Sequence, residues 1–141
     1  MNALKFVVPG EPKGKGRPRF TRAGHTYTPD ATRAYEAKIQ EAAREAMHGF
    51  PPVAKEVAFE VNVEAFFPIP KSWSKKKRLS ALQGVDRPIK KPDIDNVVKS
   101  AVDGMNGIVF VDDAQVVKLT ATKHYSETPR LEVTVRELEE A

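Results

Sequence analysis

The chain of 141 residues contains no cysteine, so disulfide bonds and thiolate metal sites are excluded. It has no run of about 18 apolar residues, so no transmembrane helix and no membrane partner are expected. Its three histidines, His25, His48 and His124, are scattered along the chain, which disfavours a zinc site. Internal repeats and low-complexity segments are absent as well. These absences leave a single globular domain over residues 1–141, in a composition that fits a cytoplasmic protein.

Charge is present in quantity but is unevenly distributed along the chain. Residues 1–92 carry 18 basic and 9 acidic residues, whereas residues 93–141 carry 5 basic and 10 acidic ones. A basic surface beside an acidic cluster suits an enzyme that holds a polyanion and cleaves it with the help of cations. Segregation of charge between helices and loops explains the same distribution equally well at this point.

Hydrophobic periodicity predicts four strands and two main helices. The strands are expected at residues 3–8, 57–67, 114–123 and 131–135. One helix is expected to open at Thr28-Pro29-Asp30 and to run to about Met47, because a hydroxyl, a proline and an acid favour a helix start. Its buried stripe is predicted to consist of Ala31, Tyr35, Ile39, Ala42, Ala43 and Ala46. The second main helix is expected to run to Met105 and to stop at Asn106-Gly107.

The loop from Pro9 to Gly24 is rich in glycine, proline and cations. Its glycines let a backbone approach a phosphate closely, and its arginines can fork onto phosphate oxygens. Because these cations cluster without acids to pair them, we expect the loop to contact DNA, although a solvated flexible loop is the plain alternative. The cations are Lys13, Lys15, Arg17, Arg19 and Arg22.

A second basic segment appears as an insertion around residues 70–90. Ser72 or Ser74 is expected to cap a short helix that runs to Leu82. Trp73 either stacks on a base or pins the insertion to the core. The DNA-binding residues expected in and just after this segment are Lys75, Lys76, Lys90 and Lys91.

Acidic residues follow directly after Lys91-Pro92, where an extended segment gives way to a helix. If Asp93 is still extended while Asp95 opens the helix, the two carboxylates can converge on one point. Lys99 lies four residues after Asp95, on the same helix face. Downstream, Asp112 and Asp113 supply further acids. An isolated Asp-x-Asp is a weak signal, since one acid can simply cap the helix and leave the other free.

Three converging carboxylates would be costly on their own, because each like-charge pair at ~4 Å repels by about 4 kcal/mol at an effective dielectric of ~20. A divalent cation removes this cost. All-oxygen ligation suits Mg²⁺, with Mn²⁺ as a substitute, and such an ion can activate water and stabilise charge on a phosphoryl group. The predicted metal ligands are Asp93, Asp95, Asp113 and Asp112. Lys99 is expected to orient the attacking water or to neutralise the transition state.

Residues 91–107 (KPDIDNVVKSAVDGMNG) and 111–117 (VDDAQVV) resemble the signature of the RusA family of Holliday-junction resolvases. The resemblance implies a mixed α/β (α+β) fold, a homodimer, and Mg²⁺-dependent nicking of four-way DNA junctions in recombination and repair, with no small-molecule cofactor. Matched by motif, Asp93, Asp95 and Asp113 would be the catalytic acids and Lys99 the catalytic lysine.

The basic loop and the insertion depart from the shorter members of that family, which leaves the fine substrate preference open. Two alternatives to a junction resolvase are kept. One is a DNA-binding protein without catalysis, and the other is a metal-dependent nuclease acting on another branched DNA or on RNA.

Overall fold

The structure, a computed structural model, describes residues 3–15, 19–20, 22–24, 26–27 and 30–139. Within these residues a four-stranded sheet has the order β1 (Ala3–Pro9), β6 (Arg130–Glu137), β4 (Phe59–Pro68), β5 (Val116–Ser126). β5 runs parallel to β4, and the other pairs are antiparallel. The predicted mixed sheet of four strands is confirmed, together with the two main helices.

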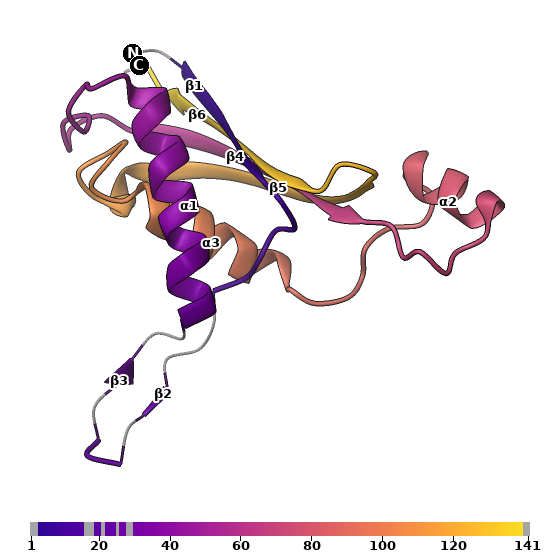
Figure 1. The fold of residues 1–141 in the computed structure, drawn as a ribbon. Coiled ribbons are helices and arrows are strands. Elements are labelled where there is room, and N and C mark those ends of the chain that lie inside the picture. The colour runs from indigo at the N-terminus through magenta and orange to yellow at the C-terminus, as the bar shows by residue number, and fades with distance from the viewer. Residues whose placement is uncertain (1–2, 16–18, 21, 25, 28–29, 140–141) are drawn as a thin grey trace.

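The remaining elements are three helices, one short 3-10 turn and a small hairpin (Figure 1). The two strands β2 (Arg19–Phe20) and β3 (Thr26–Tyr27) pair with each other and project beyond the start of α1. The helices are α1 (Asp30–Met47), α2 (Lys75–Leu82) and α3 (Ile94–Met105), and the 3-10 turn η1 spans Asp113–Gln115. The predicted helix start at Thr28 and Pro29 lies outside the described residues.

Strand β4 is one of the two inner strands of the sheet, since it pairs with both β5 and β6. Its alternation of apolar and polar residues, with a period of two, places Phe59, Val61, Val63 and Ala65 in the core. The strand begins two residues later than expected, so Val57 precedes it. The core therefore lies on one face of the sheet.

The two long helices cover that face (Figure 1). In α1 the buried stripe contains Tyr35, Ile39 and Ala43 as expected, but Ala31 is exposed and Thr32 is buried in its place. In α3 the residues Val97, Ala101 and Met105 are buried at helical spacing. The helices approach each other closely at Gly104, where an added Cβ would lie 2.4 Å from Ile39 Cγ2.

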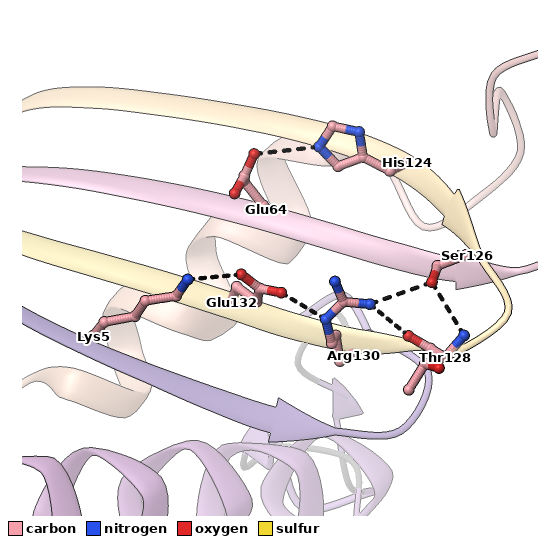
Figure 2. A network of polar contacts seen from close by, with 7 residues as sticks. All are labelled: Lys5, Glu64, His124, Ser126, Thr128, Arg130 and Glu132. Carbon is pink, nitrogen blue, oxygen red and sulfur yellow. Dashed lines mark hydrogen bonds and ion pairs between the residues drawn. The ribbon is translucent and has the colours of Figure 1, made fainter. Parts of the chain in front are cut away.

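The opposite face of the sheet is polar and carries a network of ion pairs (Figure 2). Glu132 pairs with Lys5 at 3.1 Å and accepts a hydrogen bond from Arg130. Burial raises the pKa of Glu132, but its hydrogen bonds with Arg130 and Lys5 outweigh burial and lower it overall. Arg130 also lies 3.8 Å from the ring of Phe66. Charge pairing across strands therefore stabilises the side of the sheet that the helices leave uncovered.

The basic insertion is attached to the sheet through an aromatic contact. Of the two candidate caps, Ser74 caps α2, and its Oγ accepts the backbone N–H of Lys77. Trp73 meets Tyr125 of β5 edge-on, with ring centroids 5.2 Å apart, and the Lys77 ammonium lies 4.2 Å from the Trp73 ring centroid. The tryptophan thus pins the insertion to the core. Among the described residues, no helix has the length and apolar character needed to cross a membrane.

We predict that Gly104→Ala destabilises the protein by about 1–3 kcal/mol, because the new methyl group has no space beside Ile39. Chemical denaturation would measure the change. The cost should shrink in an Ile39→Ala background, where the clashing Cγ2 is gone, and a double-mutant cycle gives the coupling. A Gly104→Ala protein as stable as the wild type would contradict the close approach of α1 and α3.

Candidate active site

The start of α3 exposes two acidic side chains. Asp93 stands at the N-cap position with an extended backbone, and its carboxylate makes no capping hydrogen bond. Asp95 follows in the first turn of the helix. The condition set out from the sequence, that Asp93 is extended while Asp95 is helical, is therefore met. A free carboxylate at this end of a helix is favoured by the helix dipole and remains available to a ligand.

Two clefts meet at Asp93. One, of about 440 Å³, is bounded by the segment Glu11–Lys15 on one side and by Lys91, Pro92, Asp93 and Asn96 on the other. The second, of about 550 Å³, is lined by residues 87–90, Asp93, Ile94, Asp95 and residues 121–123. Each cleft contains cations beside the acids: Lys13 and Lys91 in the first, and Arg87, Lys90 and Lys123 in the second. Such a surface can hold a phosphate backbone next to a carboxylate.

Contacts from the sheet fix the loop before α3. The Lys123 ammonium, on β5, donates to the carbonyl oxygen of Lys90 at 2.6 Å and to that of Pro92 at 2.9 Å. Lys123 is thus occupied in holding backbone, although its position in the second cleft suggests a free cation. These two hydrogen bonds hold the backbone that leads to Asp93 in place.

The Asp112–Asp113 turn is held in place by one buried amide. Gln115 Oε1 accepts the backbone N–H of Asp112 at 3.0 Å. Its Nε2 donates to the carbonyl oxygens of Ala54 at 2.9 Å and Val57 at 3.0 Å. Asp112 in turn caps η1 through Ala114 N–H. The acidic turn is therefore hydrogen-bonded, through Gln115, to a segment some sixty residues earlier in the chain.

Asp113 lies close to other carboxylates. Its pKa is raised, chiefly by a hydrogen bond with Asp112 and further by burial and by the negative charges of Asp112 and Asp103. Asp103 belongs to α3 and is half-buried, and its Oδ2 lies 2.9 Å from the Lys15 ammonium. Sequence reasoning missed Asp103, although its position four residues after Lys99 and eight after Asp95 was a usable signal.

The structure does not bring all the predicted acids together. Asp113 lies near Asp103, which stands about 12 Å along the helix axis from Asp95 at 1.5 Å per residue. In the part of the chain that is described, no three acidic or histidine side chains are grouped so that they could hold a metal ion. Lys99 is exposed on the helix between the two ends. The assignment of Asp93, Asp95, Asp113 and Lys99 to one catalytic site stays a prediction.

The predicted DNA-binding cations fall into different environments. The expectation that the loop cations have no acidic partners is wrong for Lys15, which pairs with Glu36 and Asp103. Lys13, Lys90 and Lys91 line the clefts beside Asp93. Three others are exposed away from these clefts: Lys75 and Lys76 on α2, and Arg22 between β2 and β3. The side chain of Arg19 is not described, and Arg17 lies outside the described residues.

Comparison with known proteins gives two matches. The family described as "Endodeoxyribonuclease RusA" matches residues 9–136. The "Uncharacterized protein YqaN" of Bacillus subtilis (strain 168) is 40% identical over 141 residues, which cover 98% of this chain and 99% of that protein. The residues matched by the family span the start of α3 and the acidic turn before β5.

We predict that Gln115→Met lowers stability by about 2–3 kcal/mol. Methionine has a similar length but cannot replace the hydrogen bonds of the buried amide, so the backbone groups that the amide binds are left unsatisfied. Thermal or chemical unfolding would measure the loss. Gln83→Met, at the exposed end of α2, is the matched control and should change stability by less than about 0.5 kcal/mol. Equal effects of the two substitutions would contradict the anchoring role of Gln115.

Proposed function

Because this chain belongs to the RusA family of endodeoxyribonucleases, we propose that it is a Mg²⁺-dependent nuclease that resolves four-way DNA junctions. The observation that carries the proposal is the position of the Asp93 carboxylate, which makes no capping hydrogen bond and lies close in sequence to Asp95. Asp93 lines two clefts, and each of them also contains cations. A nuclease needs positive charge to hold the phosphate backbone and carboxylates to recruit a metal ion. The two requirements meet at the start of α3.

The cations of the clefts support binding of DNA through its phosphates. Lys13 and Lys91 flank one side of Asp93, and Arg87 and Lys90 the other. A strand lying along both clefts would pass directly over Asp93. Such contacts release counterions, so junction binding should weaken steeply as salt is raised.

The donor set fits a hard divalent cation. The candidate ligands are carboxylates alone, from Asp93, Asp95 and Asp113, with Asp112 beside Asp113, which suits Mg²⁺ or Mn²⁺. The pKa of Asp113 is raised chiefly by its hydrogen bond with Asp112 and in part by the negative charges of Asp112 and Asp103, and a cation would relieve the repulsion among these carboxylates. When bound, the ion supplies activation of water and neutralisation of charge at the phosphoryl group. It would also have to draw the acids together, since they are not grouped in the described residues.

Lys99 is proposed to act on the reacting phosphate or on the attacking water. It lies one helical turn after Asp95, and its side chain is exposed beside the candidate site. An ammonium there can stabilise negative charge as it develops on phosphoryl oxygens.

A homodimer is part of the proposal. A four-way junction is approximately two-fold symmetric, and cutting two of its arms calls for two equivalent sites, which a symmetric dimer provides. Such an enzyme works where DNA is processed, in recombination and repair, so we also propose a cytoplasmic location.

A DNA-binding protein without catalysis is the second candidate. The observation that favours it is the lack of an assembled acidic group among the described residues. It would bind junctions through the same basic clefts but would show no metal-dependent nicking.

We predict that Asp93→Asn, Asp95→Asn and Asp113→Asn each abolish junction cleavage in Mg²⁺. Junction binding should stay near normal or become tighter, because less negative charge faces the phosphates. Lys99→Ala should slow single-turnover cleavage by about 100-fold with a smaller effect on binding. Gel assays of cleavage and binding on one labelled junction measure both quantities.

Glu127→Gln, an exposed acid in the β5–β6 turn, is the control and should cleave normally. Four-way junction, duplex, flap and RNA substrates are offered with Mg²⁺ and then with a chelator. Cleavage of the junction that stops with the chelator supports the proposal. Full cleavage by one of the three acid variants would remove that residue from the site, and junction binding without any nicking would favour the second candidate.

A further inference from the structure

A short basic segment, Glu11–Lys15, is held against α3 by contacts that a flexible DNA-binding loop would not need. The backbone N–H of Lys15 donates to the carbonyl oxygen of Asn96 at 3.0 Å. At Gly14 the backbone approaches Pro92 and the start of α3 so closely that an added Cβ would lie 2.9 Å from Pro92 Cβ and 3.0 Å from Asn96 Cβ. The residue type at position 14 is therefore limited by packing against α3.

The Lys15 side chain joins this segment to both long helices. Its ammonium lies 2.5 Å from Glu36 Oε1 of α1 and 2.9 Å from Asp103 Oδ2 of α3. All three side chains are half-buried, with exposures of 21%, 17% and 27%. Partly buried charges that are paired in this way do not readily exchange a partner for a DNA phosphate.

We propose that Lys15 is a positioning residue that clamps the segment Glu11–Lys15 to α1 and α3, and thereby sets Lys13 at the cleft beside Asp93. On this proposal Lys15 does not contact DNA, although the cations near it in the sequence are proposed to do so. The inference rests on the proposed nuclease function for its consequence, but the clamp itself is a property of the free protein.

The clamp stays closed across the physiological pH range. Burial lowers the pKa of Lys15, but the hydrogen bonds and charges of Glu36 and Asp103 outweigh burial and raise it above its ordinary value. A raised pKa means that the stabilisation is fully present below the unfolded-state value and is lost only as pH rises through the folded-state value. The pairing is therefore structural and not a pH switch.

The clamp is tested with three single variants of the full chain. Lys15→Met removes the ion pairs. Lys13→Met makes the same charge change in the same segment at an exposed position. Gly14→Ala keeps every charge but pushes the segment away from α3, so it serves if Lys15→Met fails to fold.

Hydrogen exchange of residues 11–15 in the DNA-free protein is the first measurement. Exchange should rise about tenfold or more in Lys15→Met and Gly14→Ala, because the Lys15 amide loses its acceptor, and should be unchanged in Lys13→Met. Unchanged exchange in both Lys15→Met and Gly14→Ala would overturn the clamp. This measurement stands even if the protein cleaves no junction.

Junction binding in chelator, over a range of salt, is the second measurement. Lys13→Met should weaken binding and make the salt dependence shallower by about one phosphate contact. If Lys15 acts by placing Lys13, the double variant should bind the junction almost as well as Lys15→Met alone, because Lys13 has already lost its position there. Additive losses, with the salt dependence shallower by two contacts in the double variant, would show that Lys15 binds phosphate itself and would overturn the proposal.

Discussion

The packing of α3 against α1 and against the sheet is the constraint on which the candidate site depends. Gly104 allows the two helices to approach at Ile39, while Val97, Ala101 and Met105 fill the core beneath. Contacts at both ends then fix where the helix presents its acids. Lys123 holds the entering backbone, and Lys15 ties the neighbouring segment to Asn96 and Asp103. Because these supports are buried or paired, the exposed carboxylates of Asp93 and Asp95 stand on a rigid base.

Lysine has two different uses in this protein, and charge alone does not separate them. Lys15 pairs with carboxylates inside the fold, and Lys123 donates hydrogen bonds to backbone carbonyl oxygens. Lys13, Lys90 and Lys91 line the clefts at Asp93. A count of cations in the basic two-thirds of the chain therefore overstates the number available to a polyanion.

Local pattern predicted most of the fold, because strands and helices are encoded by residues close in sequence. The alternation through β4 and the helical spacing of Val97, Ala101 and Met105 specified which faces are buried. The exposed Ala31 was misassigned because the buried stripe of α1 passes through Thr32 instead. The supports of the site could not be predicted, since Lys15 meets Asp103 and Gln115 meets Ala54 only through tertiary packing. Whether the acids converge depends on the same long-range contacts.

We propose that Asp93, Asp95 and Asp113 hold one divalent cation. Crystals soaked in Mn²⁺ test it most directly, because anomalous scattering locates the ion without assumptions about activity. We predict an ion at bonding distance from carboxylate oxygens of all three residues, with the acidic turn drawn toward the start of α3. An ion held only by Asp103, Asp112 and Asp113, or no bound ion at saturating Mn²⁺, would contradict the account.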